Sequence, residues 1–282
     1  MAKKTLIIEP GGGLGNRLLT ISSAYQLAKD CGITDIRLLW RNNNECGCDY
    51  EDVLSGLPLE TRIKTMHFGK DSYRALLKKG KFFSVLNKFI HMLFYRGFRI
   101  WSKTVQLPTY QNMSGDEQKA LRKWVLEHRR KYIYIEAYYS FYGTLDMSGI
   151  SFNREIVSRC EDYRKKIGVY DAMHIRRTDN VEAIANSPTE LFYDKIEELN
   201  NKKIYVATDD SEILGDLMTK YPDRIYSEAN STVSRMSSEG MRFALYEMLI
   251  LSGAETLYAS YGSTFTVIAN AIGHNKMIIV SK

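Results

Sequence analysis

The chain has 282 residues, of which 44% are hydrophobic and 26% are charged. These values are ordinary for globular proteins and exclude collagen, coiled coil and wholesale disorder. The length allows one large or two small domains, whose core needs no help from disulfides or metals. Lysine plus arginine number 39 and aspartate plus glutamate 33, and the resulting charge of +6 is too small to indicate a nucleic-acid partner.

Strands and helices alternate along both halves of the sequence. In the first half we expect strands at 5–9, 36–40, near 63–68 and at 132–139, with helices at 14–29 and 114–130. In the second half we expect strands at 170–177, 203–208, 224–227, 256–260 and 276–280, with helices at 190–199, 212–220, 238–252 and 264–272. Such alternation predicts parallel sheets. We therefore expect an α/β protein with two Rossmann-like domains that face a cleft, one at 1–155 and the other at 156–282.

The segment 70–103 differs from the rest of the chain. It carries nine lysines and arginines against the single Asp71, a net charge of +8. Phe82, Leu86, Phe89 and Leu93 fall on one face of a helix with this spacing. Such a basic helical insertion either docks its aromatic face on the protein's own sheet or lies on an anionic membrane surface.

Cysteine usage and the start of the chain bear on location. Cys46-Gly47-Cys48 lacks the C-x-x-C pairing of a zinc site, and four cysteines in 282 residues are typical of a reduced cytosolic protein. The opening apolar stretch is too short for a signal peptide, and no run of about 18 apolar residues predicts a membrane span. We expect a cytoplasmic protein that is either free or peripheral on the inner face of the membrane.

Ligands in open α/β sheets bind beyond the carboxyl ends of the strands, so the residues there are the candidate site. The first expected strand ends in Gly11-Gly12-Gly13-Leu14-Gly15-Asn16-Arg17. Glycines let a ligand approach the backbone, and the following helix N-terminus favours anions. The spacing matches neither a P-loop nor the G-x-G-x-x-G of NAD sites. The alternative is a tight strand-to-helix turn without a ligand.

Two basic side chains end the strand that begins the second half, in His174-Ile175-Arg176-Arg177-Thr178-Asp179. Side chains alternate along a strand, so His174 and Arg176 share one face and Arg177 points to the other. Guanidinium groups bind phosphate in a bidentate way, so Arg176 is a candidate for a diphosphate site. A structural ion pair with Asp179 is the alternative, and Arg177 fits a structural role better.

Two further strand ends carry polar residues. Ala207-Thr208-Asp209-Asp210 places Asp209 where it can contact nucleotide hydroxyls and Asp210 where it can cap the next helix. Two adjacent aspartates do not make a D-x-D metal motif, so we assign no metal. Tyr261-Gly262-Ser263-Thr264-Phe265 opens the last helix, whose N–H groups and hydroxyls can hold phosphate oxygens.

These motifs, in this order, resemble those of the fucosyltransferase superfamily, which includes α-1,6-, nodulation, protein O- and α-1,2-fucosyltransferases. The resemblance lies in Gly12-Gly13-Leu14-Gly15-Asn16-Arg17, in the H-x-R-R-x-D motif of His174 to Asp179, in Ala207-Thr208-Asp209-Asp210, and in Glu247 followed by Ser263-Thr264-Phe265. The region 45–165 matches no motif of the family. The resemblance implies a GT-B-like fold and an inverting reaction without a metal or cofactor, from a GDP-sugar, usually GDP-fucose, to a glycan or glycoconjugate.

The resemblance also implies roles for individual residues. Arg176 would sit at the diphosphate with His174 beside it, Asn16 would approach the reaction centre or the phosphates, and Gly13 and Gly15 would belong to the donor-binding site. Ser263, Thr264 and Phe265 would hold phosphate and nucleoside. Glu247 stands where the family has an aspartate that accepts hydrogen bonds from guanine. The domain at 1–155 would then be the acceptor side, and 156–282 would bind the nucleotide sugar.

The general base is the least defined role. Some family members carry a glutamate shortly after H-x-R-R-x-D, and Glu182 is the nearest here, with Glu190 further along. The α-1,6 enzymes have lysine where this chain has Asn180. Glu182 is otherwise a solvated loop carboxylate. Two other functions stay open: a glycan- or nucleotide-binding protein without catalysis, and an NADP-dependent oxidoreductase.

Overall fold

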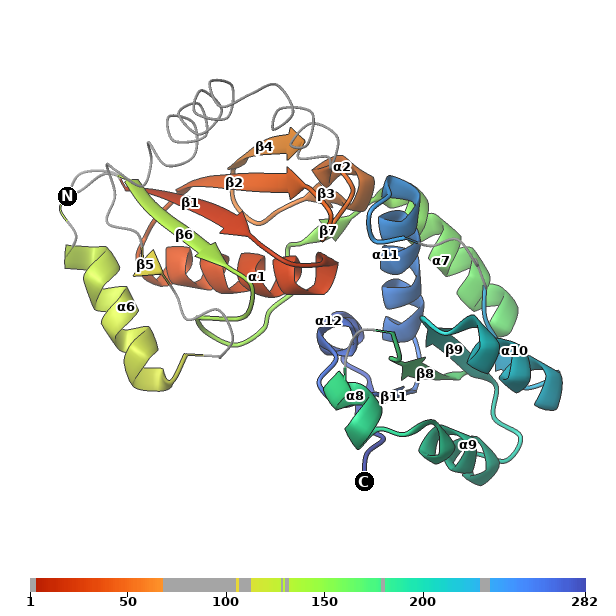
Figure 1. Cartoon of the computed structure of the whole chain (residues 1–282). Coiled ribbons are helices and arrows are strands. Elements are labelled where there is room, and N and C mark those ends of the chain that lie inside the picture. Colours follow the sequence, from red (N-terminus) through yellow and green to blue (C-terminus); the bar gives the residue numbers. More distant parts are fainter. Residues whose placement is uncertain are drawn as a thin grey trace, which may run out of the picture. The chain divides into compact units, whose positions relative to one another are not determined.

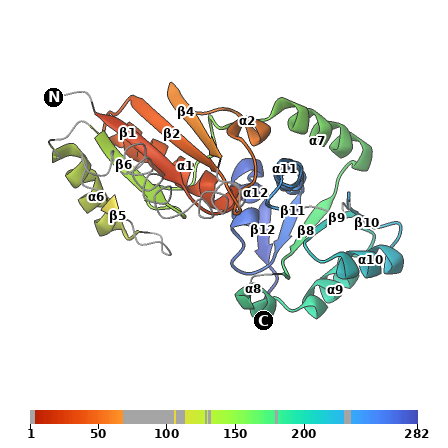
Figure 2. The same cartoon turned by 45° about the horizontal axis from the view of Figure 1, so that its top comes forward.

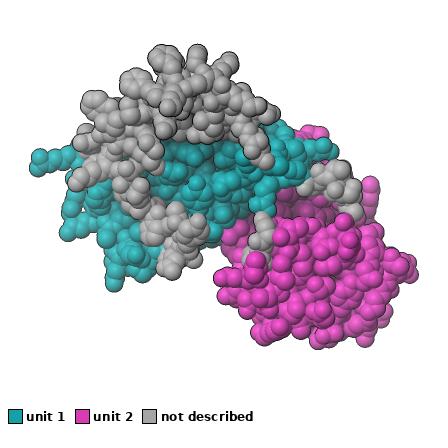
Figure 3. Space-filling model, viewed as in Figure 1, with its two compact units in different colours: residues 1–152, 234–241 teal, residues 153–233, 242–282 magenta. Residues whose placement is uncertain are grey.

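The computed structural model of the chain describes residues 4–67, 105–106, 113–127, 129, 132–178, 181–228 and 234–282. The chain divides into two compact units (Figure 3). Unit 1 contains Met1–Phe152 and Ser234–Met241, and unit 2 contains Asn153–Val233 and Arg242–Lys282. The basic insertion expected at 70–103 lies outside the described residues.

Unit 1 is built on a five-stranded parallel sheet in the order β4-β2-β1-β6-β5 (Figure 1). Its strands are β1 (Thr5–Pro10), β2 (Asp35–Asn42), β4 (Thr61–His67), β5 (Val105–Gln106) and β6 (Tyr132–Ala137). Its helices are α1 (Leu14–Asp30), α2 (Tyr50–Val53) and α6 (Gly115–Glu127). A separate antiparallel pair joins β3 (Leu54–Gly56) to β7 (Ser151–Phe152).

The core of unit 1 lies around β1 and α1. Every residue of β1 is buried, as expected for a central strand covered on both faces. Helix α1 runs along the sheet (Figure 2) and is buried on nearly all sides, including its serines and Arg17. Its polar side chains therefore bond to other segments: the Thr20 hydroxyl donates to the carbonyl of Ala137, and Ser22 donates to that of Asp146.

Unit 2 contains a second five-stranded parallel sheet, in the order β10-β9-β8-β11-β12. Its strands are β8 (Asp171–Ile175), β9 (Ile204–Thr208), β10 (Ile225–Tyr226), β11 (Thr256–Ala259) and β12 (Lys276–Ile279). Its helices are α7 (Arg154–Ile167), α8 (Val181–Asn186), α9 (Thr189–Glu198), α10 (Ser211–Lys220), α11 (Ser238–Ser252, whose first residues belong to unit 1) and α12 (Thr264–Gly273).

One face of the unit 2 sheet packs against α9 and α10. Met173, Ile175 and Val206 from the strands form a single buried cluster with Phe192 of α9 and Leu217 of α10. Because side chains alternate along β8, His174 lies on the opposite face. Met173 and Ile175 thus share one face of β8, as the alternation predicts.

Each sheet has one point at which the strand order reverses. In unit 1, β2 and β4 lie on one side of β1 and β6 lies on the other. In unit 2, β9 and β10 lie on one side of β8 and β11 lies on the other. Ligands of open α/β sheets bind at such points, outside the carboxyl ends of the two strands. The expected sites are thus the ends of β1 and β6 and the ends of β8 and β11.

The predicted α/β class with two parallel sheets is confirmed. Helix α7 is not among the expected elements, because the boundary expected between the two domains, at 155–156, falls within it. Its start is clear in retrospect: the Asn153 side chain accepts hydrogen bonds from the amides of Glu155 and Ile156, and Gly168 ends the helix with a positive φ of 77°. Among the described residues, no helix has the length and hydrophobicity needed to cross a bilayer.

Candidate active site

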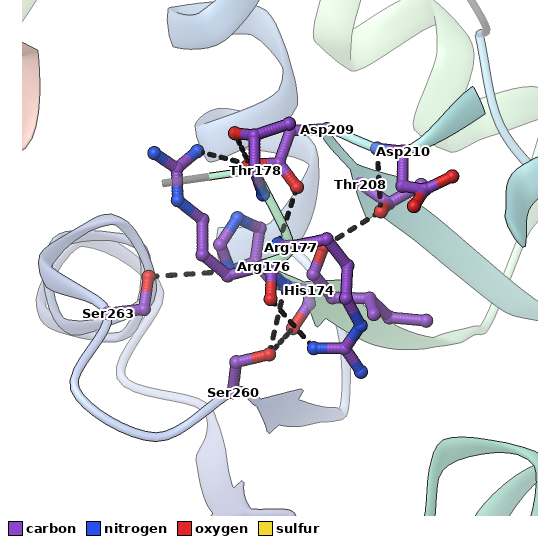
Figure 4. Close-up of polar contacts among 10 residues, drawn as sticks. His174, Arg176, Arg177, Thr178, Thr208, Asp209, Asp210, Ser260 and Ser263 are labelled. Carbon is purple, nitrogen blue, oxygen red and sulfur yellow. Dashed lines mark hydrogen bonds and ion pairs between the residues drawn. The ribbon is translucent and has the colours of Figure 1, made fainter. Parts of the chain in front are cut away.

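The ends of β8 and β11 are tied together by Ser260 (Figure 4). Its hydroxyl accepts a hydrogen bond from the Arg176 amide at 3.0 Å and donates one to the His174 carbonyl at 3.1 Å. In register, His174 is paired with Ala259. The two candidate basic residues therefore stand at the switch point of the unit 2 sheet, beside the turn that leads into α12.

His174 is enclosed by residues of that turn. Its ring stacks on Phe265 with centroids 5.0 Å apart and an interplanar angle of 21°. The Ser263 hydroxyl oxygen lies 3.4 Å from Nδ1. Burial, with the charge of Arg176 as a second cause, lowers the pKa of His174 to about 4. The imidazole is thus neutral at pH 7 and can offer one N–H donor to an anion.

Asp209, after β9, organises the turn that carries Arg176 (Figure 4). Its carboxylate accepts hydrogen bonds from the amides of Arg177 (2.7 Å) and Thr178 (3.2 Å) and from the Thr178 hydroxyl (2.7 Å). It also forms an ion pair with Arg176 at 2.7 Å. Burial would raise the pKa of Asp209, but the Thr178 hydroxyl, the charge of Arg176 and the two amides lower it below its usual value. The carboxylate is therefore ionised at neutral pH.

Arg177 has the structural role that its side of the strand predicts. It is buried, with Nε donating to the Thr189 hydroxyl at 3.0 Å and Nη1 to the Arg176 carbonyl at 2.7 Å. Its guanidinium lies 5.5 Å from the centre of the Phe192 ring. The anticipated partner, Asp179, lies outside the described residues. Arg176, on the other face of the strand, pairs instead with Asp209 and has a side-chain exposure of 24%.

Asp210 and Ser263 stand at the N-cap positions of α10 and α12, but only Asp210 caps its helix with its side chain. The Asp210 side chain caps α10 by accepting from the amides of Glu212 and Ile213, as its position predicts. Ser263 occupies the N-cap position of α12, yet its hydroxyl makes no capping bond and lies beside His174 instead. Thr264 and Phe265 begin that helix, whose first-turn N–H groups have no partner within the helix itself.

Glu247 of α11 interacts electrostatically with Asp209 of this site. Burial and, as a second cause, the charge of Asp209 together raise the pKa of its carboxyl to about 8. The charge of Glu247 in turn raises the pKa of Tyr205 on β9, after burial as the main cause. The structure thus brings the third and fourth sequence motifs together in unit 2. Sequence spacing predicts neither the interaction of Glu247 with Asp209 nor the protonated state that results.

The glycine turn of unit 1 stands at the other switch point. The Gly11 amide donates to the Ala137 carbonyl of β6 at 2.8 Å, and a Cβ at Gly11 would overlap the Tyr138 ring. Gly12 has a positive φ of 77° and contacts the half-exposed Asn16 side chain. Gly13 is the N-cap residue of α1, and Gly15 is buried in its first turn. The turn therefore depends on glycine for close packing as well as for conformation.

Arg17, the last residue of this motif, supports the turn from inside the protein. It is fully buried and donates from Nε to the Gly12 carbonyl, from Nη1 to the Arg41 carbonyl and from Nη2 to the Asn43 side chain. Glu45 contacts the turn from the outer side, where its carboxylate accepts from the Gly12 amide at 3.1 Å. Sequence reasoning did not assign a function to Asn43 or Glu45, which lie in a polar loop without a motif.

Glu182, the candidate base, lies on α8 with its side chain exposed to solvent. Its backbone carbonyl accepts a hydrogen bond from the Asn186 side chain at 2.9 Å. Glu190 is also exposed, in the first turn of α9. Asn180 lies outside the described residues. The structure therefore gathers His174, Arg176, Asp209, Glu247, Ser263 and Phe265 in unit 2, and Gly13, Gly15 and Asn16 in unit 1. Glu182 lies in the first turn of α8, also in unit 2.

Comparison with solved structures shows which known proteins share the fold of this chain. No protein-family model matches the chain. A structure of the α-1,6-fucosyltransferase NodZ soaked with GDP-fucose is 16% identical, with a TM-score of 0.61 over 96% of this chain and 93% of that one. Arabidopsis thaliana FUT1 in complex with GDP is 12% identical, with a TM-score of 0.58 over 98% of this chain and 70% of that one. POFUT1 in complex with GDP is 11% identical, with a TM-score of 0.55 over 99% of both chains. The expected GT-B-like fold of the fucosyltransferases is confirmed.

Proposed function

We propose that the chain is an inverting, metal-independent glycosyltransferase that moves fucose from GDP-fucose to a hydroxyl of a glycan or glycoconjugate. One observation carries the proposal. Arg176, neutral His174 and the start of α12 meet at the switch point between β8 and β11, where open α/β sheets bind their ligands. The likeness to fucosyltransferase structures that hold GDP or GDP-fucose supports it.

In this proposal the diphosphate of the donor lies against Arg176. The guanidinium neutralises the charge that develops on the leaving group, and Asp209 holds the turn that presents it. His174 donates one N–H to a phosphate oxygen. Ser263, Thr264 and the N–H groups at the start of α12 bind the remaining phosphate oxygens, and Phe265 supports both His174 and the nucleoside.

Glu247 would recognise the nucleobase. Guanine presents two adjacent N–H donors, and an ionised carboxylate accepts from both. With a pKa of about 8, Glu247 is largely protonated at neutral pH in the free protein, so binding guanine would release a proton. Binding of GDP is therefore expected to depend on pH.

In unit 1, Asn16 and the glycine turn would face the reacting groups, with Gly13 and Gly15 allowing close approach. Inversion requires that the acceptor hydroxyl lose its proton as its oxygen attacks the anomeric carbon and the bond to diphosphate breaks. Glu182 is the proposed base for that proton. Its location on the exposed helix α8 leaves it accessible to an acceptor.

A panel of nucleoside diphosphates in a thermal-shift assay tests the donor class. At 100 times its dissociation constant, GDP should stabilise the protein by about 2.7 kcal/mol, whereas UDP and ADP should give little. Incubation with GDP-fucose should then release GDP by slow hydrolysis even without an acceptor. The Arg176→Ala variant should lose this release, and Lys282→Ala, at the far end of the chain, should keep it. Equal stabilisation by all diphosphates would contradict the proposal.

A protein that binds the nucleotide sugar without turning it over is the second candidate. The ion pair between Arg176 and Asp209 favours it, because that contact neutralises the guanidinium without any ligand. The two functions separate in the same assay. Selective stabilisation by GDP without release of GDP from GDP-fucose, in the presence of a broad set of glycan acceptors, would support binding alone.

The basic segment 70–103 suggests that the protein binds its acceptor at a membrane surface. Its charge of +8 would attract an anionic membrane surface on the cytoplasmic side, where a lipid-linked acceptor could be presented. The protein should then sediment with anionic but not with neutral liposomes at low salt, and less so as salt rises. Failure to bind anionic liposomes at low salt would leave only the interpretation that this segment packs on the protein.

A further inference from the structure

The loop after β2 contains a pair of thiols that the proposed function does not use. Cys46 and Cys48 are both fully buried, and their sulfur atoms lie 3.6 Å apart in a thiol–thiol hydrogen bond. Cys31 and Cys160 also carry free thiols, and Cys160 donates instead to the carbonyl of Tyr246. We propose that Cys46 and Cys48 are a redox-active dithiol, which a hydroperoxide oxidises to an intramolecular disulfide.

The surroundings favour a thiolate at one member of the pair. The hydrogen bond from the Cys48 thiol lowers the pKa of Cys46, and the same bond raises the pKa of Cys48. Burial opposes the first effect and adds to the second, while the charge of Arg17 lowers the pKa of Cys46 further and offsets part of the rise at Cys48. Arg17 is held in place by three hydrogen bonds and lies over the Trp40 ring at 4.6 Å. A nearby cation lowers the pKa of a thiol and so increases the fraction of thiolate, which is the form that reacts.

The reaction balances with one hydroperoxide. The Cys46 thiolate attacks a peroxide oxygen, the O–O bond breaks, and the departing hydroxide takes a proton to become water. The Cys48 sulfur then attacks the resulting sulfenic acid, so that the S–S bond forms as the S–O bond breaks. The second hydroxide leaves with the Cys48 proton. Each sulfur loses one electron, and the peroxide gains two.

The disulfide would act on the glycine turn. Its sulfurs must approach to about 2.05 Å, so the loop has to adjust. The backbone of Cys46 is paired with Asn43 by two hydrogen bonds of 3.1 Å, and the Asn43 side chain also accepts from Arg17, which holds the Gly12 carbonyl. Glu45 of the same loop holds the Gly12 amide. Oxidation is therefore expected to affect the contacts of Arg17 and Glu45 with Gly12, two of the contacts that fix the turn.

The other end of the loop is fixed. The Gly47 amide donates to the Arg235 carbonyl at 2.8 Å, and a Cβ at Gly47 would overlap the backbone of Met236. The Trp40 indole donates to the Cys48 carbonyl at 2.8 Å. Since these contacts restrain Gly47 and Cys48, the adjustment is expected to fall on the Asn43–Cys46 side, which contacts the turn.

Peptide mass mapping of the full-length protein tests the proposal. After hydrogen peroxide, the peptide with both cysteines should lose two hydrogen atoms, and dithiothreitol should restore them. The reaction should be on the order of tenfold faster than oxidation of Cys160, because burial raises the pKa of that thiol. Oxidised glutathione should react poorly, because both sulfurs are buried. The Cys31→Ser control should behave like the unmodified protein, and Cys48→Ser should stop at oxidised, unlinked Cys46.

The effect on the turn is measured separately, by hydrogen exchange at the Gly12 and Gly13 amides. Oxidation should raise that exchange in the parent and in Cys31→Ser, but not in Cys48→Ser or Cys48→Ala. This readout does not depend on the proposed enzymatic activity. If peroxide gives mixed or over-oxidised cysteines without the intramolecular link while the protein stays folded, the proposal is refuted. A link that forms without any change at the turn refutes the coupling.

Discussion

Two adjacent aspartates at the end of β9 allow the organisation of the site to be tested by matched substitutions. Asp209 accepts three hydrogen bonds from Arg177 and Thr178 and pairs with Arg176 at 2.7 Å. Asp210 accepts from two amides at the start of α10, at 3.0 and 3.1 Å. Asp209→Ala should therefore damage the turn after β8, whereas Asp210→Ala should only remove a helix cap.

The contacts give the expected magnitudes. A hydrogen bond to a charged group contributes about 1.5–3 kcal/mol, but side-chain exposures of 24% for Arg176 and 21% for Asp209 let water replace part of the loss. We expect Asp209→Ala to lower the free energy of unfolding by about 3 kcal/mol. Loss of an N-cap costs about 1 kcal/mol. The melting temperature should fall by about 6–12 °C for Asp209→Ala and by about 2–4 °C for Asp210→Ala.

Thermal unfolding at several pH values adds an independent check. The pKa of Asp209 is lower in the folded protein than in the unfolded chain, where it is about 3.9. Its contribution is therefore fully present above about pH 4 and is lost as the pH falls through the folded value. The difference in stability between the parent and Asp209→Ala should shrink in acid. Equal destabilisation by the two alanine variants, or a difference that does not change in acid, would refute the role assigned to Asp209.

The sequence predicted the parts of the fold that depend on local pattern. Strands such as 204–208 and helices such as 238–252 have hydrophobic periodicity that tertiary contacts reinforce, so their positions follow from the residues. Helix α7 carried equally clear signals in its Asn153 cap and in the spacing of Ile156, Cys160 and Ile167. It is missing from the expected elements because the expected boundary between the two domains, at 155–156, falls within this segment.

The site was predictable where it follows strand ends. His174 and Arg176 stand at the end of β8, and Ser263 follows β11, which is far from β8 in sequence. Parallel strands bring their carboxyl ends to one edge of the sheet, so the proximity of these residues could be inferred. The sequence does not allow two other sets of contacts to be inferred: those of Glu45 with Gly12, and those of Arg17 with three carbonyl or amide oxygens. They depend on how a loop without a motif folds back on the glycine turn. The same applies to the charge of Glu247, which is determined by burial and by Asp209 rather than by its residue type.

Three further predictions follow from the donor site. Arg176→Ala should lower kcat for donor turnover by about 10²–10³-fold. Arg176→Lys should recover only part of the lost activity, because lysine lacks the planar guanidinium that binds phosphate through two N–H groups. Near-normal turnover by the alanine variant would contradict a diphosphate role. His174 has a pKa of about 4 in the folded protein against 6.5 in the unfolded chain. Between these two pH values only the unfolded chain binds the proton, so acidification should lower the free energy of unfolding by up to about 3 kcal/mol. If the free energy of unfolding of a His174→Gln variant depended on pH as steeply as that of the parent, this contribution would be excluded. For Glu247, guanine's two N–H donors need the ionised carboxylate, whereas the free protein holds the proton up to a pKa of about 8. The affinity for GDP measured by calorimetry should therefore rise about tenfold per pH unit below 8 and level off above it, because binding must displace that proton. Glu247→Gln cannot titrate and presents a donor to guanine's donors, so its affinity should be weak and independent of pH. A parent protein whose GDP affinity stays constant across the same range would show that Glu247 does not contact the base.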